Sequence, residues 1–184
     1  FPLDDYRLLK NLFSKNKIWD KIFGDDFTLI NNPDLPWYTG NSVFDGEWVT
    51  TKKTVIFEKW VFLSKFYNYK NALKEWLENL WNSSVYNIEL VKSKTYDDNI
   101  LAWNKILFTN LMALHTVDAS TWKYSLNWEW YLIENWKKWD FIKNISLSGN
   151  VIDLFSNIKN IWNDYKTYWN YRVPSISFYN QKVV

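Results

Sequence analysis

The chain contains 184 residues, of which 47% are hydrophobic, 21% aromatic and 23% charged, a composition too apolar for a disordered protein. Its formal net charge of +2 disfavours a protein whose main role is to neutralise nucleic-acid phosphates. Because there is no cysteine and one histidine, disulfides, thiolate nucleophiles and cysteine-ligated metals are excluded, and histidine catalysis has little scope.

The first half of the chain predicts helices on either side of an irregular segment. An apolar stripe behind an acidic cap predicts a helix over residues 5–23. Residues 25–50 hold two glycines and two prolines and predict a loop that ends in a small hairpin. Helical spacing of apolar residues then predicts a long helix over 54–81, and alternation predicts a short strand over 86–90.

Strands become prominent after a second long helix, which the apolar spacing predicts over residues 97–118. Residues 122–132 are apolar at every second position, as in a strand with one solvated face. Residues 139–147 repeat this alternation less regularly and predict an antiparallel partner. A helix over 128–143 is the alternative interpretation.

The end of the chain predicts one more helix and a last short strand. Asn150 is placed as the N-cap of a helix that continues with a wide apolar stripe to about residue 173. Ile176 and Phe178 predict the strand. The sequence therefore predicts a single domain over 1–184 of the α+β class, with three or four long amphipathic helices packed on a small antiparallel sheet centred on 121–147. An all-α bundle is the alternative.

Tryptophan is the most unusual feature of the composition. The chain has fourteen tryptophans but only four glycines, and Asn, Lys, Ile, Phe and Tyr are abundant, as expected from an AT-rich gene. The GC-rich codon TGG should be scarce in such a gene, so we interpret the tryptophans as products of TGA codons read as tryptophan. That code occurs in some mitochondria and in wall-less bacteria, and it predicts a gene from one of these genomes.

No catalytic motif is present, because the glycines are too dispersed for a phosphate-binding loop and no metalloprotease or nucleophile-elbow spacing occurs. His115 follows an apolar stripe, where a helix-capping role is sufficient. The carboxylates of Glu129, Glu134, Asp140 and Asp153 are expected on a solvated face, although a pair of them would suit a hydrolase. We predict no catalytic residue, no metal site and no cofactor.

Exposed aromatic and basic side chains define a candidate interaction surface, because indole rings offer flat apolar faces for protein, base or lipid contacts. This surface consists of Trp128, Trp130, Trp136, Lys137, Lys138 and Trp139.

The favoured hypothesis is a non-catalytic subunit of a large mitochondrially encoded assembly, either a respiratory-chain or ATP-synthase complex or, less favoured, the ribosome. Its expected partners are protein subunits, with peripheral contact to RNA or lipid, no DNA and no membrane span, since the longest apolar runs are far below about 20 residues. The alternative is a glycan- or protein-binding surface domain of a wall-less bacterium or its virus, at the cell surface or secreted. A small carboxylate-dependent hydrolase ranks third.

Overall fold

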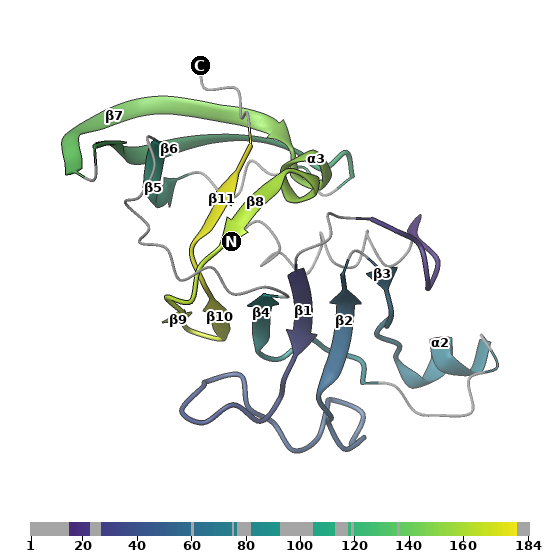
Figure 1. The fold of residues 1–184 in the computed structure, drawn as a ribbon. Helices are drawn as coiled ribbons and strands as arrows, with labels where there is room; N and C mark the ends of the chain where they lie inside the picture. Colours follow the sequence, from purple (N-terminus) through teal and green to yellow (C-terminus); the bar gives the residue numbers. More distant parts are fainter. Residues whose placement is uncertain are drawn as a thin grey trace.

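Strands dominate the protein (Figure 1). The computed structural model describes residues 15–22, 27–59, 61–74, 76, 82–92, 105–112, 118, 120–135 and 137–179. Within these ranges the strands form a six-stranded, a three-stranded and a two-stranded sheet, and the helices α2 and α3 are six residues each.

The six-stranded sheet combines strands from both ends of the chain. In spatial order it contains β3 (Val61–Phe62), β2 (Thr54–Glu58), β1 (Phe27–Asn31), β4 (Ile88–Lys92), β10 (Tyr171–Val173) and β9 (Lys166–Tyr168). Neighbouring strands are antiparallel except β4 and β10, which run parallel. Strands β9 and β10, from near the end of the chain, therefore complete a sheet that the first strands begin.

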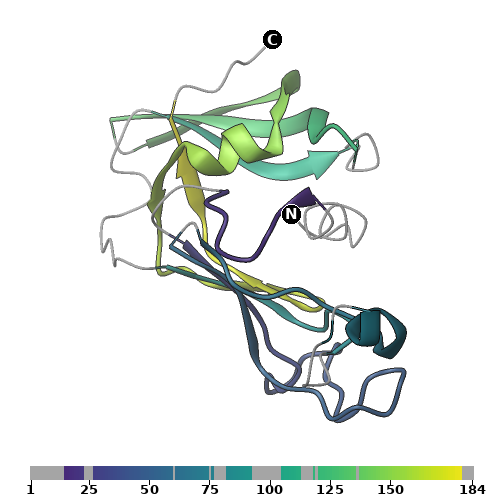
Figure 2. The ribbon, with the colours of Figure 1, turned by 90° about the vertical axis from the view of Figure 1, so that its right-hand side faces the viewer.

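The three-stranded sheet is a meander of β5 (Lys105–Met112), β6 (Lys123–Glu134) and β7 (Lys137–Asn150). In the first part of β6, Tyr124 and Leu126 are buried whereas Lys123 and Ser125 are exposed, as the pleat of a half-buried strand requires. This sheet lies at one end of the molecule and the six-stranded sheet at the other (Figure 2). The pair β8 (Ile158–Ile161) and β11 (Ile176–Phe178) lies between them (Figure 1).

The helices α2 (Tyr69–Lys74) and α3 (Val151–Ser156) are short. The side chain of Asn150 caps α3 by accepting a hydrogen bond from the backbone N–H of Ile152 at 2.8 Å. One continuous apolar core joins α3 to both large sheets. It contains Leu29, Ile56, Phe57, Phe62, Ile88, Leu90, Trp122, Tyr124, Leu126, Leu147, Val151, Leu154, Phe155 and Ile161.

The predicted α+β fold with three or four long helices is wrong, and so is the all-α alternative. Residues 54–58 and 105–112, both assigned to long helices, are strands β2 and β5. Residues 158–173 contain β8, β9 and β10, so the last predicted helix ends at Ser156. These segments are rich in β-branched and aromatic residues or in asparagine, and helix propensity, below about 0.7 kcal/mol per ordinary residue, is easily outweighed by strand pairing.

Other predictions agree with the structure. The strands expected over 122–132, 139–147 and 86–90 correspond to β6, β7 and β4, and the predicted cap at Asn150 begins α3. Most of the predicted helix over 5–23 lies outside the described residues, but the prediction is wrong for residues 16–22, which are not helical and include an antiparallel bridge from Lys21 to Val61. The segment between β1 and β2 contains a single antiparallel bridge, from Phe44 to Thr50. No helix within the described ranges is long and apolar enough to cross a membrane.

The substitution Phe57→Ala tests the core. Phe57 is fully buried, and its ring centroid lies 5.2 Å from that of Phe62 on the paired strand. The lost contacts and the cavity should lower the free energy of unfolding by about 3–5 kcal/mol, measured by urea denaturation. Phe44→Ala, at a half-exposed ring, should cost under about 1 kcal/mol. Equal losses at the two positions would contradict this description of the core.

Candidate functional site

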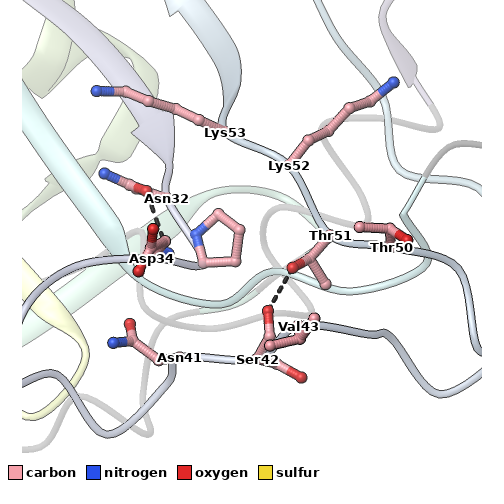
Figure 3. A pocket seen from close by; sticks show the side chains of 10 residues that line it. Asn32, Asp34, Asn41, Ser42, Val43, Thr50, Thr51, Lys52 and Lys53 are labelled. Atoms are coloured by element: carbon pink, nitrogen blue, oxygen red, sulfur yellow. Dashed lines mark hydrogen bonds between the residues drawn. The ribbon is translucent and has the colours of Figure 1, made fainter.

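A pocket of about 710 Å³ opens where the loop after β1 meets the segment that leads into β2 (Figure 3). Eight of its ten lining residues have polar side chains, which carry amide, hydroxyl, carboxylate and ammonium groups. The lining residues are Asn32, Pro33, Asp34, Asn41, Ser42, Val43, Thr50, Thr51, Lys52 and Lys53.

Side-chain hydrogen bonds shape the walls of the pocket. The carbonyl of Asn41 accepts from the backbone N–H of Leu35 at 3.0 Å, and its amide donates to the backbone carbonyl of Leu35 at 2.6 Å. Opposite, the hydroxyl of Thr51 donates to the backbone carbonyl of Ser42, as Figure 3 shows. These bonds replace sheet pairing in a segment whose backbone would otherwise lack partners.

A buried carboxylate lies next to the pocket. The side chain of Glu89 on β4 is only 6% exposed and accepts hydrogen bonds from the Asn32 amide at 2.9 Å and the Arg172 guanidinium at 3.0 Å. The ammonium of Lys53 lies 3.9 Å from the same carboxylate. Asn32 and Lys53 also line the pocket, so Glu89 holds the Asn32 amide by a hydrogen bond and lies close to the more exposed Lys53 ammonium.

Asparagine side chains connect the pocket to the six-stranded sheet. The buried Asn87 amide donates to the backbone carbonyl of Asn32 at 2.8 Å and to the side chain of Asn41 at 2.6 Å. The carbonyl of Asn31 accepts from the backbone N–H of Tyr86 at 2.7 Å. Pocket wall and sheet are therefore one hydrogen-bonded unit.

Asp45 anchors the far end of the loop. Its carboxylate accepts from the backbone N–H groups of Glu47 and Val49, both at 2.9 Å, and from that of Ser83 at 3.1 Å. Burial raises the pKa of this carboxyl, but the hydrogen bonds from Ser83, Val49 and Glu47 together outweigh burial, so its pKa lies below the ordinary 3.8.

The interaction surface predicted from the sequence is only partly described. Trp128 and Trp130 belong to β6, but their side chains, like the whole of Trp136, lie outside what the structure describes. Lys137, Lys138 and Trp139 begin β7 and are exposed. The ammonium of Lys138 lies 3.4 Å from the centroid of the Tyr131 ring, and the Trp139 indole N–H donates to the carbonyl of Glu134 at 3.3 Å. The surface stays a prediction.

Sequence reasoning missed the pocket. Its polar residues follow β1 or precede β2 without a motif, and Glu89 and Arg172 are far apart in the chain. The available signals were the paired Asn31 and Asn32 after an apolar run, and an arginine in a chain whose cations are nearly all lysine.

Comparison with known proteins assigns the family. The model of the PmbA/TldA metallopeptidase C-terminal domain matches residues 6–184, so the chain belongs to this family.

Two curated relatives carry protease names. The chain is 26% identical over 156 residues to a metalloprotease of Archaeoglobus fulgidus, which covers 79% of this chain and 36% of the relative. It is 28% identical over 158 residues to a metalloprotease PmbA homolog of Buchnera aphidicola, covering 84% of this chain and 35% of the relative. The chain thus spans about a third of the length of these relatives.

A solved structure shares the fold. The crystal structure of a protein described as a candidate modulator of a DNA gyrase, from Thermotoga maritima, superposes with a TM-score of 0.84 at 24% identity. The match covers 97% of this chain and 44% of that protein. At this identity the likeness shows the fold alone.

The predicted function and location are wrong. A metallopeptidase family with relatives in bacteria and archaea replaces both the mitochondrially encoded respiratory, ATP-synthase or ribosomal subunit and the alternative of a surface-binding domain. The predicted mitochondrial location is wrong for the same reason. The error arose because amino-acid composition reports on the genome and its code, which many genomes share, and carries no direct information about function.

The family name implies a metal ion, and the described residues do not fit one. Among them no group of three His, Cys, Asp or Glu side chains is close enough to hold a metal. Glu134 is exposed at the end of β6, and Asp153 lies in the first turn of α3. His115 and the side chains of Glu129 and Asp140 lie outside the described part of the chain.

Arg172→Met tests the pairing of the buried carboxylate. The substitution removes the shortest charged contact of Glu89 and should destabilise the protein by about 1.5–3 kcal/mol in urea denaturation. Adding Glu89→Gln should recover part of this loss, because the buried charge is then gone. Lys123→Met, at an exposed cation on β6, is the matched control and should change stability by less than about 0.5 kcal/mol. An Arg172→Met loss no greater than the control loss would contradict the assignment.

The pH dependence of stability tests the anchor at Asp45. Because its folded pKa lies below 3.8, the carboxylate stabilises the protein at neutral pH, and this stabilisation disappears as the pH falls through the folded pKa. The difference in unfolding free energy between the protein and Asp45→Asn should therefore be largest above about pH 5 and shrink below about pH 4. A difference that grows on acidification would show that the hydrogen bonds do not favour the charged form.

Proposed function

We propose that this chain serves in peptide-bond hydrolysis as the C-terminal domain of a metallopeptidase, and that the pocket at residues 32–53 binds the peptide. The observation that carries the proposal is a pocket, lined mainly by residues with polar side chains, next to the buried carboxylate of Glu89 in a chain of the PmbA/TldA metallopeptidase family.

The pocket chemistry suits a peptide. A peptide backbone offers alternating N–H and C=O groups, and the amides of Asn32 and Asn41 can serve both, while Ser42 and Thr50 add hydroxyls. Lys52 and Lys53 can attract a substrate carboxylate, and their side chains diverge from each other at the rim (Figure 3). The pocket volume of about 710 Å³ lies within the usual range of about 300–1,000 Å³ for binding pockets.

The proposal assigns the pocket a binding role. Glu89 and Asn87 hold the side chains of Asn32 and Asn41 by hydrogen bonds before a ligand arrives, which limits the entropy lost on binding. Cleavage of the peptide bond is assigned to the rest of a full-length protein of this family, because no three His, Cys, Asp or Glu side chains among the described residues lie close enough to hold a metal. The relatives named as metalloproteases are about three times as long as the matched part.

Steady-state hydrolysis by the full-length protein tests this function. On peptides that carry an acidic side chain or a free carboxyl terminus, Lys53→Met should raise KM about tenfold and leave kcat within about twofold, because the charge contact is the same in ground and transition states. Lys53→Arg keeps the charge and should restore KM. Lys123→Met again controls for loss of an exposed cation.

Two outcomes would refute the proposal. If the full-length protein cleaves no peptide, the chain has no part in hydrolysis. If it cleaves peptides and Lys53→Met leaves KM unchanged, the pocket is not where they bind.

A further inference from the structure

Six tryptophans have a backbone conformation that normally belongs to glycine. Among the described residues, eight non-glycine residues have positive φ, and six of these are tryptophan. Their φ angles lie in the left-handed region, which a Cβ atom disfavours by about 1–2 kcal/mol and which bulky residues rarely adopt. They are Trp19 (79°), Trp37 (68°), Trp48 (60°), Trp76 (55°), Trp122 (63°) and Trp169 (51°). None of the described glycines has positive φ.

The local structures at these positions are turns that favour glycine. The N–H of Trp76 donates to the carbonyl of Leu73 at 3.2 Å just after α2, where helices commonly end in a left-handed glycine. Trp169 and Asn170 form the two-residue loop between the paired Tyr168 and Tyr171, a loop type that requires positive φ.

A second hairpin also has a loop residue with positive φ. Glu134 pairs with Lys137, and the first loop residue, Asn135, has φ of 48°. Loops of this kind favour Asn followed by Gly, and the sequence continues with Trp136.

For most of these tryptophans, burial of the indole ring does not offset the backbone strain. Five of the six side chains are between 73% and 100% exposed, and Trp37 is fully exposed. A buried aromatic ring stabilises a fold by removing about 150–250 Å² from water, whereas a fully exposed ring removes almost none. A role in binding would explain exposed tryptophans, but it would not explain why they occupy left-handed turns.

A reassigned UGA codon, which would explain the number of tryptophans, can also be translated as an amino acid other than tryptophan. A UGA codon is read by a tRNA with anticodon UCA. A glycine tRNA with anticodon UCC becomes such a reader through one base change, as does a tryptophan tRNA with anticodon CCA. The AT-rich composition therefore indicates a reassigned UGA without indicating which amino acid is inserted.

We propose that the positions printed as Trp19, Trp37, Trp48, Trp76, Trp122 and Trp169 are encoded by UGA codons that the source organism translates as glycine, together with any other tryptophan here that UGA encodes. Four glycines are few for a chain of 184 residues, in which an average share of about 7% gives about 13. If all fourteen tryptophan codons are UGA, the protein has eighteen glycines.

The proposal has a consequence for the candidate interaction surface. Each of its four tryptophans that UGA encodes would be a glycine. If all four are, only the side chains of Lys137 and Lys138 remain on the candidate interaction surface. An aromatic docking surface on this chain therefore requires those positions to be true tryptophans.

Peptide mass spectrometry of the protein purified from its source, beside the codons of its gene, tests the proposal directly. We expect UGA at the six codons and glycine at the six positions in the peptides. Tryptophan in the peptides at UGA-encoded positions, or TGG at the six codons, overturns the proposal.

A second test uses recombinant protein that carries the printed residues. Changing Trp37, Trp48, Trp76 or Trp169 singly to glycine should raise Tm by about 2–4 °C for each site, because the strain is relieved and almost no packing is lost. Alanine at the same position is the matched control, since it also removes the indole but keeps the Cβ, and it should not raise Tm. Equal effects of glycine and alanine would show that the backbone places no demand for glycine there. Trp122 is buried and is left out of this comparison.

Discussion

The buried carboxylate of Glu89 determines which segments of the sheet must meet. A charge in a low-dielectric interior is costly unless it is paired and hydrogen-bonded, and no residue near Glu89 in sequence supplies that pairing. The amide of Asn32 comes from the residue after β1, the ammonium of Lys53 from the residue before β2 and the guanidinium of Arg172 from β10. Strands β1, β2, β4 and β10 thus meet around one side chain. The same contacts bring Asn32 and Lys53 to the wall of the pocket.

Buried asparagine side chains add further hydrogen bonds between the six-stranded sheet and the loops around it. Asn31, Asn32, Asn82 and Asn87 are all buried, and their side chains bond to backbone groups where the regular ladder stops. An AT-rich gene supplies asparagine readily, and in this fold the residue does what turns and caps require, because its amide can imitate a peptide group. The segments around the pocket are therefore joined by side-chain hydrogen bonds, with few hydrophobic side chains in the lining.

Local signals identified some elements and misidentified others. Strand β6 and the Asn150 cap of α3 could be predicted from the sequence, because each depends on residues next to one another in the chain. The segments that became β2 and β5 have apolar residues at helical spacing, yet Leu29 and Phe57 are buried together only when β1 and β2 pair, a contact no local pattern contains. The pocket could not be predicted from the sequence for the same reason, because only strand pairing brings Asn32, Lys53 and Glu89 together. The number of tryptophans indicated an unusual genetic code, and the positive φ angles were needed to connect these positions with glycine.

The order of strands in the six-stranded sheet also governs when the domain can fold during synthesis. Glu89 and Arg172 are 83 residues apart, so β4 leaves the ribosome long before the parallel strand that covers its edge. At about 5–20 residues per second, this interval lasts about 4–16 s. During that time the nascent chain carries an open strand edge and a carboxylate without its guanidinium partner. The time for which this edge stays open therefore depends on how quickly residues 90–172 are translated.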